Sequence, residues 1–385
     1  MLGVTVSAIA GCSAAPSYSD QVTDAPSLDS LAQPTISVTG WRDKPMTDKA
    51  VGVMPGAPIT VRAQDGSLSS VVVSGPDGPV PGTTSPDGAT WVSKQSLSFG
   101  ADYTLTAAAK GVDGNGASKI GFTTAFADSL ADASTITEDG ETVGVGQPVA
   151  INFDTPITNK LNAQNAISVV TDPPVAGAFY WISDSMVRWR PEHFWAPGTK
   201  VHVKANLKGI DLGDGVYGDN NLSTNFTVGR SMVSVADDKT KQITVSVNGK
   251  VVKTMPTSMG KDSTPTNNGV YVVAEREPSV IMDSSTYGVP VGSPGGYREV
   301  VDDATRISFS GIYVHSAPWS LGDQGVDDVS NGCLNVSPEN AEWFLNHSLR
   351  GDIVIAKNTV GPPLPGDDGL GDWNVPWAVW KKGNA

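Results

Sequence analysis

The chain has 385 residues, a formal net charge of −14, 42 glycines, 27 prolines and two cysteines. An acidic chain without a basic stripe does not suit nucleic acid, whose phosphates bind Lys and Arg, so we exclude a nucleic-acid partner. The length suffices for two or three domains, and the richness in Gly, Pro, Ser, Thr and Val predicts a mainly β protein with many turns.

Residues 1–12 resemble the end of a signal peptide with a bacterial lipobox, because Cys12 follows Ile9-Ala10-Gly11 and a short apolar stretch. That stretch is too short to span a bilayer, and no Lys or Arg precedes it, which leaves the true start codon open. We predict lipidation of Cys12 and a location on the outer face of the plasma membrane. The alternative is a disordered terminus with a chance cysteine. Residues 13–34 are small, polar and acidic, which predicts a flexible linker.

Two segments, 35–128 and 129–229, alternate apolar and polar residues over short runs separated by Asp-Gly and Pro-Asp-Gly turns. This pattern predicts two tandem immunoglobulin-like β-sandwiches. The runs Asp113-Gly114-Asn115-Gly116 and Asp211 to Asp219 invite a calcium site as an alternative, but neither has the spacing of a calcium-binding loop, so we interpret both as turns.

The segment 230–357 adds further strands and one clear helix. Asn248-Gly249 between two alternating runs predicts a hairpin. Ser337 is suited to cap a helix that begins at Pro338. The tail 358–385 carries tryptophans, which we expect to pack back on this third domain as a small subdomain; a sugar-binding platform is the alternative. These tryptophans are Trp373, Trp377 and Trp380.

The stretch from Val314 to Asn335 holds the strongest candidate for a reactive site. Eighteen positions separate His315 from Cys333, so the two side chains meet only if a loop folds back between two strands. A thiol becomes nucleophilic as a thiolate, and a nearby imidazole is the usual means. The alternatives are a structural cysteine with an unrelated histidine, or a zinc site, for which the other histidines lack ligand spacing.

Four stretches of the third segment together resemble the L,D-transpeptidase catalytic domain, also called YkuD. They are P-T-S-M-G-K-D-S-T-P-T-N-N-G-V-Y from Pro256, M-D-S-S-T-Y-G-V-P from Met282, V-H-S-A-P-W-S from Val314 and S-N-G-C-L-N-V-S from Ser330. The two sandwiches and the tryptophan-rich tail resemble the mycobacterial members. This resemblance implies formation of peptidoglycan cross-links between the diaminopimelate residues of two stem peptides, with loss of D-Ala from a tetrapeptide donor.

The resemblance also implies roles for individual residues. Cys333 would be the nucleophile and His315 its general base, oriented by the carbonyl of Ser316. Backbone N–H groups around Gly332 and Cys333 would stabilise the oxyanion. Six positions would contact substrate: Tyr297, Asn335, Met282, Tyr287, Trp319 and Ser330. The resemblance implies no metal or cofactor, and it implies covalent inhibition by carbapenems.

One residue departs from the family pattern, because Asn331 stands where S-H-G-C has His. Asn forms hydrogen bonds but carries no proton at neutral pH. We therefore expect a slower or differently specific enzyme of the subset that shares this Asn. Two alternatives are an L,D-carboxypeptidase, in which water resolves the thioester, and a weakly active or non-catalytic wall-binding scaffold.

Overall fold

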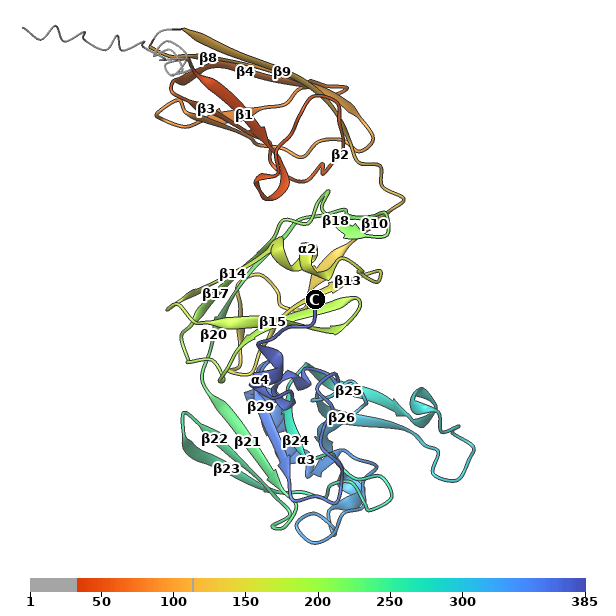
Figure 1. Ribbon diagram of the computed structural model, residues 1–385. Helices are drawn as coiled ribbons and strands as arrows, with labels where there is room; N and C mark the ends of the chain where they lie inside the picture. The colour runs from red at the N-terminus through yellow and green to blue at the C-terminus, as the bar shows by residue number, and fades with distance from the viewer. Residues whose placement is uncertain (1–32, 113) are drawn as a thin grey trace, which may run out of the picture.

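A computed structural model describes residues 33–112 and 114–385 of the chain. Figure 1 shows three lobes that follow one another in chain order. Strands make up most of the regular structure, so the predicted mainly β fold is confirmed. Residues 1–32, which include Cys12 and most of the predicted linker, and Asp113 lie outside the described residues. None of the helices within the described ranges is long and apolar enough to cross a membrane.

The first lobe is a sandwich of two sheets with one apolar core between them. One sheet has the order β1 (Thr35–Thr39), β3 (Thr60–Gln64), β7 (Thr90–Ser93), β6 (Gly82–Thr84). The other has the order β2 (Ala50–Val53), β9 (Asn115–Thr124), β8 (Asp102–Lys110), β4 (Ser67–Gly75), β5 (Gly78–Pro79), and η1 (Trp41–Asp43) follows β1. Tyr103, Leu105 and Ala107 of β8 are buried and alternate with more exposed residues, as expected for a strand with one face on a core.

The second lobe is also a sandwich, with a small third sheet. Its main sheets have the orders β11 (Ala133–Thr135), β13 (Val149–Phe153), β16 (Met186–Pro191), β15 (Gly177–Ser183) and β12 (Glu141–Val143), β20 (Leu222–Val228), β17 (Lys200–Ala205), β14 (Ile167–Asp172). The small sheet has the order β10 (Ser129–Ala131), β19 (Val216–Gly218), β18 (Asp211–Gly213), and α2 (Lys160–Asn165) lies nearby. Trp181, Trp189 and Trp195 fill the core.

The third lobe combines two sheets with a helix. The first sheet has the order β23 (Lys250–Pro256), β22 (Gln242–Val247), β21 (Met232–Asp237), β29 (Ile353–Lys357), β24 (Gly269–Val272). The second has the order β25 (Glu275–Asp283), β26 (Arg298–Arg306), β27 (Tyr313–Ser316), β28 (Leu334–Val336), and η2 (Ser284–Tyr287) lies in the β25–β26 connection. The long β25–β26 hairpin projects from the lobe in Figure 1.

Local signals in the third lobe behave as predicted. Asn248 and Gly249 adopt positive φ between β22 and β23, which confirms the hairpin. The predicted helix is α3 (Pro338–His347), and the side chain of Ser337 accepts a bond from the N–H of Asn340 at its start. Ala341 and Phe344 of α3 are buried in the same core as residues of β27 and β28. The helix therefore supports the two strands that carry the candidate site.

The C-terminal tail corrects one expectation. Asn374 of η4 (Gly371–Asn374) bonds the backbone of Val270 in the third lobe. The indole N–H groups, however, reach the second lobe: Trp373 donates to Gly146 O and Trp380 of α4 (Trp377–Trp380) donates to Ala178 O. The prediction that these tryptophans pack on the third domain was therefore wrong for these two rings.

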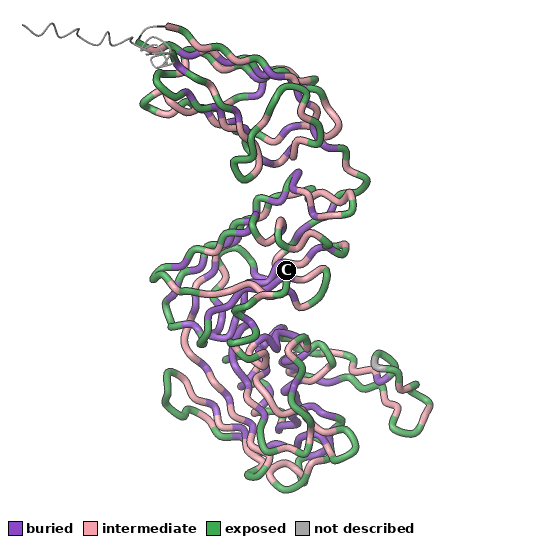
Figure 2. The backbone as a smooth tube through the Cα atoms, viewed as in Figure 1, coloured by how far each residue is buried: buried purple, intermediate pink, exposed green. Residues whose placement is uncertain are grey.

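Two arginines of β16 explain the course of the tail. Arg188 forms an ion pair of 2.7 Å with Asp372 of the tail, and both side chains are buried. The guanidinium of Arg190 lies over the rings of all three tail tryptophans and donates to Val375 O. Core residues of the second lobe also form one cluster with Val272 and Ile353 of the third, and buried positions meet at this interface in Figure 2. The second and third lobes thus share a core.

Candidate active site

The topology brings the two candidate reactive residues to neighbouring strands. Strands β27 and β28 pair in parallel, with His315 opposite Asn335 and Val314 opposite Leu334, so Cys333 lies one position before β28. The chain between them folds back as a loop that includes η3 (Pro318–Ser320). His315 and Cys333 line one cavity of about 180 Å³.

His315 is almost fully buried, at 3% exposure. Its Nδ1 lies 2.9 Å from Ser316 O, which makes Nδ1 the donor and leaves Nε2 able to accept a proton. Burial lowers the pKa of His315 from its ordinary value of 6.5, and the bond to Ser316 acts in the opposite direction. The imidazole is therefore neutral, and available as a base, at neutral pH.

Cys333 is a free, buried thiol. Burial raises its pKa to about 11, although the backbone N–H of Tyr313 acts in the opposite direction. Its Sγ lies 3.5 Å from the carbonyl oxygen of Gly311, to which it donates. The resting site therefore holds a neutral thiol and a neutral imidazole, and attack by sulfur requires a base to remove the proton.

The loop before Cys333 is held by hydrogen bonds between the side chain of Ser330 and the backbone of Gly332 and Cys333. Ser330 Oγ accepts from the N–H of Gly332 at 3.0 Å and donates to Cys333 O at 2.7 Å. Gly332 has a φ of +120°, a region that favours glycine, and an added Cβ would lie 2.8 Å from Ile312. Since Ser330 already engages the N–H of Gly332, the geometry favours Cys333 over Gly332 as the oxyanion donor.

Most of the predicted substrate-contacting residues line the same cavity. The sequence-predicted residues found there are Met282, Tyr297, Trp319, Ser330, Asn331 and Asn335. Trp319 is 56% exposed, and its ring centroid lies 6.1 Å from that of His315. Asn335 donates to Ser320 Oγ, and its buried Oδ1 has no partner among the described residues. The backbone of Tyr287 belongs to η2, but its side chain lies outside what the structure describes.

A second cavity, of about 350 Å³, adjoins the first, and sequence reasoning named only part of its lining. It shares Met282 and Tyr297 with the first cavity and adds Arg306, Phe309 and Gly311. Gly311 O accepts from the thiol, so this wall touches the reactive sulfur. The stretch I-S-F-S-G-I-Y, which directly precedes Val314, was the available signal. Within the ranges 33–112 and 114–385, no group of three or more His, Cys, Asp or Glu is placed to hold a metal ion.

Comparison with known proteins decides the family. The model of the L,D-transpeptidase catalytic domain matches residues 231–355, and that of a bacterial Ig domain matches residues 50–211. L,D-transpeptidase 2 of Mycobacterium tuberculosis is 55% identical over 341 residues, which cover 88% of this chain and 84% of that protein. The chain belongs to the L,D-transpeptidase family.

Solved structures of other L,D-transpeptidases agree with this assignment. A complex of LdtMt1 with imipenem is 38% identical with a TM-score of 0.52, and covers 58% of this chain and 97% of that chain. L,D-transpeptidase 3 of M. tuberculosis with a faropenem-derived adduct is 38% identical with a TM-score of 0.50, and covers the same shares. The predicted fold class, Ig-like sandwiches followed by a catalytic L,D-transpeptidase domain, is thus confirmed.

Proposed function

We propose that this chain cross-links peptidoglycan stem peptides through a thioester on Cys333. The observation that carries the proposal is the placement of His315 on β27 and of Cys333 directly before the adjacent parallel strand β28, both lining one cavity, with Nδ1 of His315 bound to Ser316 O. A general base so oriented suits removal of a proton from a thiol that burial keeps neutral.

The reaction proceeds in two steps, acylation of Cys333 and transfer of the acyl group to an amine. His315 Nε2 takes the thiol proton while Sγ attacks the diaminopimelate carbonyl of a tetrapeptide donor. The C–N bond to the terminal D-Ala then breaks, and the imidazolium returns the proton to the leaving amine. In the second step the side-chain amine of another stem attacks the thioester carbonyl, and His315 accepts the amine proton. The C–S bond then breaks, and the imidazolium returns the proton to the sulfur of Cys333. The Cys333 N–H stabilises the oxyanion of both tetrahedral intermediates.

Mass spectrometry of the full chain tests this proposal. Incubation with a disaccharide-tetrapeptide should release D-Ala and yield a cross-linked dimer, and incubation with imipenem should add one drug mass to the peptide that contains Cys333. D-Ala release with only a tripeptide product would replace transfer by carboxypeptidase activity. A folded protein with neither product nor adduct would favour a scaffold function.

The asparagine at position 331 is proposed to slow the enzyme. Asn331 is exposed at the rim of the cavity, and its Oδ1 lies 3.4 Å from the hydroxyl of Thr264. A histidine here would add a titratable donor beside the developing negative charge, so Asn331→His is expected to raise the acylation rate by about tenfold, below the full effect of one oxyanion donor. Stopped-flow acylation by imipenem measures this. Equal rates for Asn331→His, Asn331→Ala and wild type would show that the side chain at position 331 has no effect on acylation.

We also propose that Cys12 carries a lipid that holds the protein at the outer face of the plasma membrane. The lipobox-like Ile9-Ala10-Gly11-Cys12 supports this proposal. Expressed in a bacterial host that lipidates exported proteins, the wild type should sediment mainly with membranes, and Cys12→Ser should become mainly soluble. A wild type that stays in the soluble fraction would contradict the anchor.

A further inference from the structure

The segment from Pro256 to Thr266, one of the stretches singled out in the sequence, has no part in the chemistry described above. It runs along the loop that carries Cys333. Ser258 and Asn335 bond each other through both backbone groups, and Met259 O accepts from the N–H of Ser330 at 3.0 Å. This segment therefore supports the loop of residues 328–333, here called the nucleophile loop.

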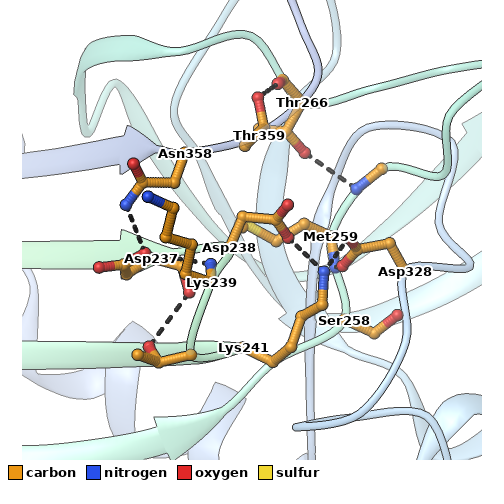
Figure 3. Close-up of polar contacts among 12 residues, drawn as sticks. Asp237, Asp238, Lys239, Lys241, Ser258, Met259, Thr266, Asp328, Asn358 and Thr359 are labelled. Atoms are coloured by element: carbon orange, nitrogen blue, oxygen red, sulfur yellow. Dashed lines mark hydrogen bonds and ion pairs between the residues drawn. The ribbon is translucent and has the colours of Figure 1, made fainter.

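The start of the nucleophile loop is fixed by charge. Figure 3 shows Lys241 between Asp238 and Asp328, and all three side chains are at most one-fifth exposed. Asp328 Oδ1 also accepts from the N–H of Met259 at 2.9 Å. The loop is thus tied to the supporting segment at Asp328, five residues before Cys333. This contact does not reach the peptide group between Gly332 and Cys333.

Thr266 contacts the peptide group between Gly332 and Cys333. Its side chain is fully buried, and its hydroxyl accepts from the N–H of Gly260 at 3.0 Å. A hydroxyl has a single proton to donate, and here it goes to the carbonyl oxygen of Gly332 at 2.7 Å. The backbone of Thr266 is itself held, because its carbonyl accepts from the hydroxyl of Thr359 at 2.6 Å, as Figure 3 shows. The position and the direction of the Thr266 hydroxyl are therefore set by these three hydrogen bonds.

The carbonyl of Gly332 and the N–H of Cys333 belong to one peptide group. Because a trans peptide is planar, its C=O and N–H point in opposite directions. A bond that fixes the oxygen of Gly332 therefore fixes the direction of the Cys333 N–H, away from Thr266. Ser330 restrains the two flanking peptides, through Gly332 N–H and Cys333 O, but not this oxygen. Gly332 offers little resistance of its own, since glycine is permissive in φ and ψ.

We propose that Thr266 is a positioning residue that aims the backbone N–H of Cys333 at the oxyanion formed during acylation. This inference rests on the proposed acyl transfer and deepens it. Thr266 touches neither substrate nor sulfur; it acts through the Gly332–Cys333 peptide. A preorganised donor stabilises the transition state because it need not reorient as charge develops.

Two reactions of the same thiol separate this role from a merely structural one. Acylation by imipenem passes through an oxyanion, whereas alkylation by iodoacetamide is a direct displacement that forms none. In the full chain, Thr266→Val removes the hydroxyl at constant shape and is expected to slow acylation of Cys333 by about 10–100-fold, somewhat less than deletion of a donor. Alkylation of Cys333, followed on its tryptic peptide, should change by less than about twofold, and Thr266→Ser should restore most of the acylation rate.

Thr305→Val is the matched control, because it removes another fully buried threonine hydroxyl of the same lobe that has no partner among the described residues. It should leave both rates unchanged. If Thr266→Val does not fold, Thr266→Ala takes its place with the same expectation. Unchanged acylation in the Thr266 variant, or a parallel fall of acylation and alkylation, would overturn the inference alone. A wild type that imipenem does not acylate would overturn the proposed function and this inference with it.

Discussion

Replacing His315 with glutamine is expected to slow acylation of Cys333 by about 10²–10⁴-fold, the usual contribution of a general base. The physical reason is the state of the thiol, whose pKa burial raises to about 11. At neutral pH almost all of it is protonated, and glutamine accepts a hydrogen bond but not a proton. Single-turnover acylation by imipenem, read by intact mass spectrometry, gives the rate.

The pH profile tells whether the lost group was the base. Burial lowers the pKa of His315 below 6.5, so wild-type acylation should rise with pH only below that value and then stay level through neutrality. Without the imidazole, the rate should keep rising with pH up to the pKa of Cys333, about 11, because the thiolate forms only in that range. His347→Gln, an exposed histidine of α3, should behave as wild type, and Cys333→Ala sets the zero of the assay. A His315→Gln profile that matches the wild type would exclude His315 as the base.

The elements that sequence predicted well are those with a local physical cause. The hairpin at Asn248-Gly249 follows from positive φ at two adjacent residues, and the start of α3 follows from the cap at Ser337. The course of the tail has no such local cause. Trp373 and Trp380 bond carbonyls of Gly146 and Ala178, about two hundred positions earlier, and no pattern within the tail encodes those partners.

The candidate site divides in the same way. The reactive pair, His315 and Cys333, could be named from its motif, and the parallel pairing of β27 with β28 explains why it meets. The carbonyl of Ser316, which orients His315, was also named, but two other contacts that hold the site in place were not. Gly311 meets the thiol through a backbone oxygen, and Thr266 reaches Gly332 across 66 positions. Backbone contacts leave no residue-type signature, so a sequence alone does not reveal them.

Replacing Asp372 with alanine is expected to destabilise the joined second and third lobes by about 3–5 kcal/mol, the usual effect of removing one partner of a buried ion pair. Asp372 is fully buried, and its Oδ1 lies 2.7 Å from Nη1 of Arg188. Burial raises the pKa of Asp372, and Arg188 acts in the opposite direction. Without Asp372 the guanidinium of Arg188 stays buried with no counter-charge, beside the second buried cation, Arg190. Urea unfolding monitored by tryptophan fluorescence measures the loss.

Two further variants show whether charge or packing is responsible. Asp184→Ala breaks an ion pair with Lys160 on the same sandwich, but Asp184 is 75% exposed, so this change should cost less than about 1 kcal/mol. The double variant Arg188→Met with Asp372→Leu removes both charges and should recover most of the stability lost by Asp372→Ala, because no buried charge is then left unpaired. If the double variant is as unstable as Asp372→Ala, the tail is held to β16 by the shape of this contact and not by its electrostatics. Recovery would show that the instability of Asp372→Ala comes from the unpaired charge left on Arg188.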